Sequence, residues 1–131
     1  MFETTARLKV REGQLEGFKT QAAEMMRLTS EKDTKTLRYD WFLSDDETEC
    51  EVREAYVDAD ALLEHSNHVG EARNKLFRDY ADGHTMTFYA EPSPALAEAL
   101  EAMPHGAVEI KRFSFLQGLD AGIKVLDEVP A

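Results

Sequence analysis

The chain has 131 residues, of which 43% are hydrophobic, and acidic residues outnumber basic ones by 26 to 15, giving a formal charge of −11. This predicts one globular domain, and the acidic excess argues against binding to nucleic acid or to an anionic membrane. No segment approaches the roughly 18 consecutive apolar residues of a membrane span, and no secretory signal pattern is visible. Because Cys50 is the only cysteine, we expect a reduced, cytoplasmic protein without an internal disulfide.

Alternating and helical periodicities divide the chain into eight elements. The predicted order is strand, helix, strand, strand, helix, strand, helix and strand, over residues 3–10, 14–29, 36–44, 49–57, 59–81, 84–91, 94–103 and 108–116. Gly70 is expected to divide the second helix, and Asp82-Gly83 to end it. Strand, helix, two strands, helix and strand is the ferredoxin-like order, so we predict an α+β fold with an antiparallel sheet.

The domain organisation follows from this order. We expect a single domain over residues 1–117, with a core over residues 3–91 and an additional helix and strand over residues 92–117. Residues 118–131 are expected to form a tail.

Large apolar side chains fall at both alternating positions of the predicted strands, namely Trp41 and Phe42, Phe88 and Tyr89, and Ile110 and Phe113. A sheet that is apolar on both faces needs a cover on each. Helices cover one face, and a second copy of the sheet would cover the other. The pattern therefore predicts a homodimer.

Three segments resemble the antibiotic biosynthesis monooxygenase family, over roughly residues 5–77: Ala6-Arg7-Leu8-Lys9-Val10-x-x-Gly13 with Phe18, Leu37-x-Tyr39, and Glu54-Ala55-Tyr56-Val57-Asp58-x-Asp60-Ala61-Leu62-x-x-His65. The resemblance implies a dimeric α+β barrel. It also implies oxygenation of quinols or polycyclic aromatics by oxygen, without metal or flavin as cofactor. The family tryptophan on the third strand is Tyr56 here, so a role that needs an indole N–H does not carry over.

His65, Tyr56 and Glu54 are the candidate catalytic residues. His65 lies on the apolar stripe of its helix and could act as a base toward a phenol or quinol, with Tyr56 and Glu54 positioning substrate oxygens. If these strand residues line a cavity, the pKa of Glu54 is raised. The alternatives are a histidine packed against the sheet, and a Glu54 that pairs with Arg38 or Arg53 across the hairpin.

The candidate substrate-binding residues are aromatic or cationic. Tyr39, Trp41, Phe88 and Tyr89 could stack on a flat aromatic ligand, although aromatic residues in strands also serve as core or dimer interface. Phe77 is a further candidate substrate-binding residue. Arg38 and Arg53 could hold an anionic group, or belong to a cross-strand ion cluster. Glu64, His65 and His68 could converge on a metal ion, but a site needs three protein ligands and the spacing supports only the two histidines. No metal is therefore expected.

Four functions follow, of which a cofactor-independent monooxygenase acting on an aromatic or quinol-like molecule leads. The second is a non-catalytic ligand-binding or structural dimer, which a filled interior instead of a cavity of roughly 300 Å³ would favour. The third is an isomerase or decarboxylase acting on a small anion, if Arg7, Arg38 and Arg53 point into the cavity. The fourth, haem degradation, ranks low because Ala6 stands where the haem-degrading branch has asparagine.

Overall fold

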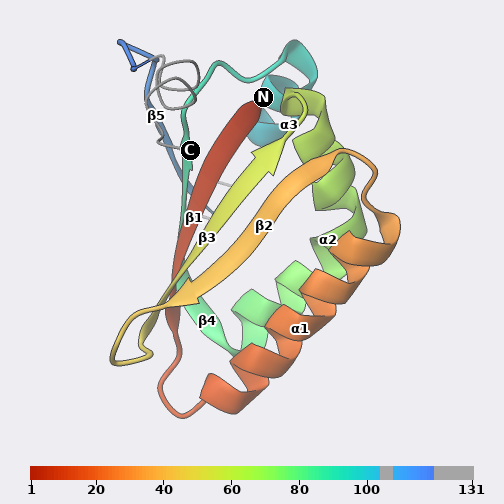
Figure 1. Cartoon of the computed structure of the whole chain (residues 1–131). Coiled ribbons are helices and arrows are strands. Elements are labelled where there is room, and N and C mark those ends of the chain that lie inside the picture. Colours follow the sequence, from red (N-terminus) through yellow and green to blue (C-terminus); the bar gives the residue numbers. More distant parts are fainter. Residues whose placement is uncertain (104–107, 120–131) are drawn as a thin grey trace, which may run out of the picture.

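The computed structural model describes residues 1–103 and 108–119, and it confirms the predicted α+β fold. Its elements are β1 (Phe2–Val10), α1 (Leu15–Lys32), β2 (Thr36–Leu43), β3 (Glu49–Tyr56), α2 (Ala59–Asp79), β4 (Ala81–Phe88), α3 (Pro94–Glu101) and β5 (Glu109–Arg112). Figure 1 shows α1 and α2 lying together across one face of the sheet, and no helix of the described residues lies on the opposite face. None of the helices in the described ranges is long and apolar enough to cross a membrane.

The sheet has the strand order β2-β3-β1-β4-β5. The first four strands pair antiparallel, as the ferredoxin-like order requires. The C-terminal extension adds a fifth strand, because α3 returns the chain so that β5 pairs parallel with β4. The sheet is therefore mixed, and the extension adds one strand to it beside β4.

Strand alternation separates the two faces of the sheet. On β1, Phe2, Ala6 and Leu8 are buried against the helices, while Arg7 and Lys9 lie on the opposite face. We call this side, on which no described helix packs, the open face. Its cross-strand rows include Phe42, Glu51 and Arg7, and also Asp40, Arg53 and Thr5.

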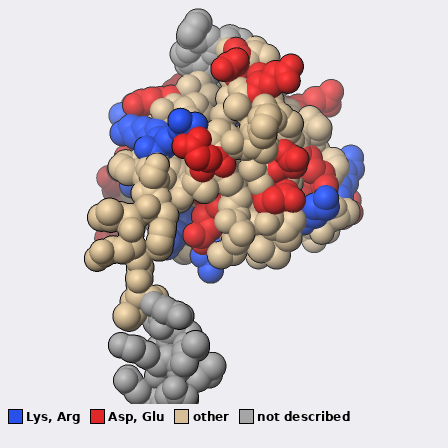
Figure 2. Space-filling view, turned by 90° about the horizontal axis from the view of Figure 1, so that it is seen from above, with Lys and Arg blue, Asp and Glu red and all other residues tan. Residues whose placement is uncertain are grey.

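The open face carries both exposed aromatic residues, as the sequence pattern predicted, and more charged residues than that pattern suggested. Phe42, Tyr89 and Phe113 are 53%, 45% and 58% exposed, whereas Trp41 and Phe88 pack toward the helices. Charged residues of both signs occupy the centre of the face, including an Arg7–Glu51 ion pair of 2.9 Å. Figure 2 shows acidic groups scattered among uncharged residues over the end of the molecule seen from above, with basic groups mainly near its margins.

Side-chain caps begin two of the helices, α2 and α3. The Asp58 carboxylate accepts a hydrogen bond from the backbone N–H of Ala61 (2.9 Å), and the Ser93 hydroxyl accepts one from Leu96, with Pro94 in the first turn.

Two expected breaks are wrong. Helix α2 continues through Gly70, because one glycine costs only about 1 kcal/mol relative to alanine and the flanking face is buried. Asp82-Gly83 lies inside β4, where the β1–β4 register shifts and Gly83 adopts φ 67°. The helix ends earlier, where the Arg11 side chain donates to the carbonyl oxygens of Phe77 and Arg78.

Other element ends also differ. Helix α1 extends three residues beyond the predicted end, so that Asp33 becomes its C-terminal cap residue. Strand β5 covers only four residues, and 113–119 form no regular element. Most of the expected tail, 120–131, lies outside the described residues.

Candidate functional site

A cavity of about 230 Å³ lies between the helical face of the sheet and helices α2 and α3. Its walls are mainly apolar and include Leu8, Val52, Leu62, Met86, Phe88 and Leu96. A cavity of about 150 Å³ can hold benzene, and drug-sized ligands occupy roughly 300 Å³ or more. The space therefore suits a ligand of one or two rings.

Glu54 reaches this cavity from the centre of the sheet. Its register partners are Thr4 on β1 and Tyr39 on β2, and only 6% of the residue is exposed. The hydroxyl of Tyr56, which is fully buried, donates a hydrogen bond to Glu54 Oε1. Burial raises the pKa of Glu54 to about 7, so this carboxyl can hold or release a proton near neutral pH.

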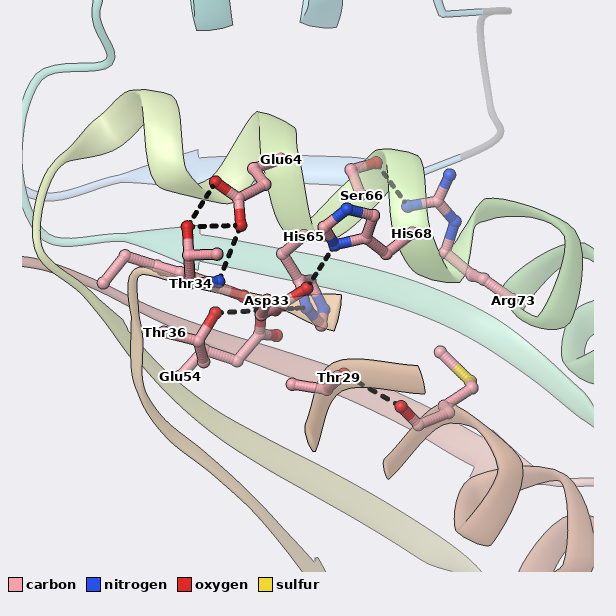
Figure 3. Close-up of polar contacts among 12 residues, drawn as sticks. Thr29, Asp33, Thr34, Thr36, Glu54, Glu64, His65, Ser66, His68 and Arg73 are labelled. Atoms are coloured by element: carbon pink, nitrogen blue, oxygen red, sulfur yellow. Dashed lines mark hydrogen bonds and ion pairs between the residues drawn. The ribbon is translucent and has the colours of Figure 1, made fainter. Parts of the chain in front are cut away.

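His65 is oriented by Asp33, which stands where α1 ends (Figure 3). Asp33 Oδ2 lies 2.7 Å from His65 Nδ1, and Oδ1 lies 2.6 Å from His68 Nδ1. The Thr36 hydroxyl donates to the same carboxylate at 2.6 Å. Burial alone would raise the pKa of Asp33, but these hydrogen bonds outweigh it and lower the pKa. Asp33 is thus an ionised carboxylate shared by two histidines.

The ring of His65 also faces the aromatic residues of the sheet. Its centroid lies 4.6 Å from that of Tyr39 and 5.6 Å from that of Tyr56. Burial lowers the pKa of His65 despite the opposing effect of Asp33, so the ring is neutral at pH 7. The Asp33 hydrogen bond assigns the proton to Nδ1. Nε2, which makes no hydrogen bond to any described residue, is left with an available lone pair.

Tyr39, Trp41 and Phe77 all line the cavity. The Tyr39 and Trp41 rings meet edge to face at 5.8 Å, and Phe77 stacks on His84 at 4.5 Å. The buried indole N–H of Trp41 has no hydrogen-bond partner within the described part of the chain. It is a donor that a ligand oxygen in the cavity could satisfy.

Arg38 and Arg53 do not line the cavity. Arg38 Nε lies 3.5 Å from Asp40 Oδ2, and Arg53 is the register partner of Asp40 on the open face. The predicted substrate set placed these residues together with Tyr39 and Trp41, but alternation along a strand puts the two groups on opposite faces. Arg7 also lies on the open face, so none of the three arginines that would favour the anion-processing function lines this cavity.

Two ionisable residues of the cavity wall, Arg73 and His84, were not among the predicted site residues. Arg73 follows Val69 by four positions and precedes Leu76 by three, so helical spacing could have placed it on the buried face of α2. Asp33 gave no comparable signal, because only the packing of α1 against α2 brings it to His65.

One group of side chains has the composition of a metal site. Ligand atoms of Asp33, Glu64 and His68 lie within 4.8 Å of one another. Each carboxylate is already hydrogen-bonded: Glu64 accepts from the backbone N–H and the hydroxyl of Thr34, at 2.7 and 2.9 Å (Figure 3). Hydrogen bonds between described residues therefore account for the arrangement.

The model of the family described as antibiotic biosynthesis monooxygenase matches residues 1–85. The chain therefore belongs to this family, as the sequence segments had indicated. The comparison with curated proteins gives no match.

Solved structures share the fold at low identity. MupZ from Pseudomonas fluorescens is 23% identical, with a TM-score of 0.72 over 91% of this chain and 93% of its own. Rv0793 from Mycobacterium tuberculosis (23% identity, TM-score 0.60) aligns with 72% of this chain and 97% of its own. SO0527 from Shewanella oneidensis (19% identity, TM-score 0.60) aligns with 69% of this chain and 89% of its own. The similarity to MupZ is long enough to include part of the C-terminal extension.

Proposed function

We propose that this protein is a cofactor-independent monooxygenase that binds a small aromatic, quinol-like molecule in the cavity between the sheet and α2. The observation that carries the proposal is a neutral His65, held at Nδ1 by Asp33, in the wall of a mainly apolar cavity. Family membership supports an oxygenase-type or small-molecule-binding role.

In this mechanism, His65 Nε2 accepts the proton of a substrate hydroxyl, and Asp33 stabilises the imidazolium that forms. The resulting anion is rich enough in electrons to reduce oxygen directly. With 1-naphthol the reaction balances as naphthol plus O₂ giving 1,4-naphthoquinone plus water. One oxygen atom enters the ring and the other leaves as water, so all four electrons come from the substrate and no external reductant is consumed.

The other side chains would position the substrate. Glu54, with Tyr56 hydrogen-bonded to it, faces the cavity as a group that can accept or donate at a substrate oxygen near neutral pH. Tyr39 and Trp41 would form the wall on which the ring rests, and the free indole N–H could donate to a second oxygen. The apolar lining excludes water from the anion.

The test is oxygen uptake with 1-naphthol, corrected for the rate without protein. Wild type should consume oxygen, and His65→Gln should reduce kcat by at least about a hundredfold while circular dichroism shows an intact fold. Lys75→Gln, an exposed change on the same helix, serves as the control. Uptake that survives in His65→Gln would remove His65 from the mechanism.

A non-catalytic binding protein is the second candidate, because the cavity is smaller than most substrate pockets. It predicts that aromatic ligands bind and shift the fluorescence of Trp41 while no oxygen is consumed. Binding together with uptake decides for the enzyme.

We also propose that residues 1–117 form a single domain, and that the protein acts as a homodimer in the cytoplasm. The exposed aromatic side chains of Phe42, Tyr89 and Phe113 support pairing through the open face. Cys50 is a buried free thiol, and burial raises its pKa to about 11, which suits a protein that does not use disulfides.

A further inference from the structure

Arg73 brings a positive charge to the wall of a mainly apolar cavity. It is half-buried on α2, and its Nη1 donates a hydrogen bond to Ser66 Oγ at 2.9 Å. Figure 3 shows the guanidinium beside Ser66 and farther from the Asp33 carboxylate. Burial lowers the pKa of Arg73, which is the expected penalty for placing a charged group there.

Within the described part of the chain, the charge of Arg73 forms no ion pair with a carboxylate. Most other arginines of the described chain form ion pairs with carboxylates, namely Arg7, Arg11, Arg27, Arg38, Arg78 and Arg112. Among residues 1–103 and 108–119, no carboxylate oxygen lies within 4.0 Å of Arg73. In a protein with a formal charge of −11, a half-buried arginine without an acidic partner is unusual.

The ionisable groups that line the same cavity do not neutralise the charge of Arg73. Glu54 lies in the same cavity and interacts with Arg73 through space, but its carboxyl is hydrogen-bonded to Tyr56 and is partly protonated near neutral pH. His84, which also lines the cavity, is held neutral because burial and the charge of Arg73 lower its pKa to about 4.

We propose that Arg73 is the binding site for an anionic group of the substrate, so that the cavity takes aromatic carboxylates. The guanidinium supplies charge-assisted hydrogen bonds to the carboxylate, and Ser66 and Asn67 line the same part of the cavity as polar neighbours. The ring then extends along the apolar wall toward Tyr39 and His65. This inference rests on the proposed function only in treating the cavity as the substrate site.

The test compares two probes of the same shape, 4-hydroxybenzoate and 4-hydroxybenzamide, of which only the first is an anion at pH 7.5. Trp41 is the only tryptophan and lines the cavity, so its fluorescence reports binding. The titration uses the full chain without oxygen, so it measures binding whether or not the oxygenase proposal holds.

Wild type should bind the benzoate at least about tenfold more tightly than the benzamide, which is the usual effect of a hydrogen bond to a charged group. Arg73→Gln should bind both probes with the affinity that wild type shows for the benzamide. Arg73→Lys should keep part of the preference. Arg78→Gln, which removes an exposed arginine of the same helix, should keep all of it.

Equal affinity of wild type for the two probes overturns the proposal, and this comparison needs no variant to fold. A preference that survives in Arg73→Gln overturns it as well. So does a lack of benzoate binding at concentrations up to about 10 mM.

Discussion

At the scale of single residues, the carboxyl of Glu54 makes stability depend on pH. Its pKa in the folded protein, about 7, exceeds the ordinary value of 4.5 because the group is buried. The folded chain therefore holds this proton more tightly than the unfolded chain, and the stabilisation present below about pH 4.5 is lost as the pH rises to about 7.

Replacing Glu54 with Gln should remove this dependence while keeping an acceptor for Tyr56. Between pH 5 and pH 8, the free energy of unfolding of wild type should fall by about 3 kcal/mol relative to Glu54→Gln. Urea denaturation at several pH values measures both. Curves that stay parallel over this range would contradict a raised pKa at Glu54.

Asp33 is expected to act through His65. Asp33→Asn keeps the size of the side chain but removes the charge that stabilises an imidazolium, so kcat for 1-naphthol should fall at least about tenfold while KM changes less. Glu64→Gln is the matched control, because Glu64 contacts Thr34 and not His65. An equal loss in both variants would indicate that the two carboxylates act together, as they would on a metal ion.

Strand periodicity predicted part of the site. It grouped Glu54 with Tyr56, and Tyr39 with Trp41, because side chains two residues apart share a face. The same rule puts Arg38 on the face opposite to Tyr39. Asp33 and its hydrogen bonds could not be predicted, since they depend on how α1 packs against α2.

At the scale of elements, two helical glycines should respond to alanine in opposite ways. At Gly70 an added Cβ meets only Arg73 Nη2, at 4.0 Å, whereas at Gly17 it would lie 2.2 Å from the ring of Tyr80. Gly70→Ala should stabilise the protein by about 0.5–1 kcal/mol, because alanine favours a helix interior.

Gly17→Ala gains the same helix preference but forces the Tyr80 ring to move, so it should be destabilising. Thermal unfolding of both variants tests the pair. If Gly70→Ala destabilises the protein, that result would contradict a helix α2 that continues through residue 70.

Sequence patterns predicted the order of the elements better than their ends. Capping residues such as Asp58 and Ser93 act locally, so their positions could be predicted. The end of α2 depends on Arg11, which is distant in sequence and satisfies the last carbonyls of the helix. Local turn signals at Asp82-Gly83 gave no information about that contact.

At the scale of the whole molecule, the proposed homodimer would pair through the open face. If two copies pair there, the exposed ring of Phe42 becomes part of an interface related by twofold symmetry. Phe42→Glu should then shift the protein to monomers in analytical ultracentrifugation. Met26→Glu, which changes an exposed apolar residue on α1, should leave the dimer intact. Equal masses for wild type and Phe42→Glu would contradict pairing through this face.

The oxygenase proposal for the whole protein is tested most directly by the fate of oxygen. Wild type is incubated with 1-naphthol under ¹⁸O₂, and the quinone is analysed by mass spectrometry immediately after quenching. The account predicts 1,4-naphthoquinone carrying one ¹⁸O atom, formed at a rate that falls in His65→Gln. No quinone above the protein-free rate, or quinone without label, would contradict it.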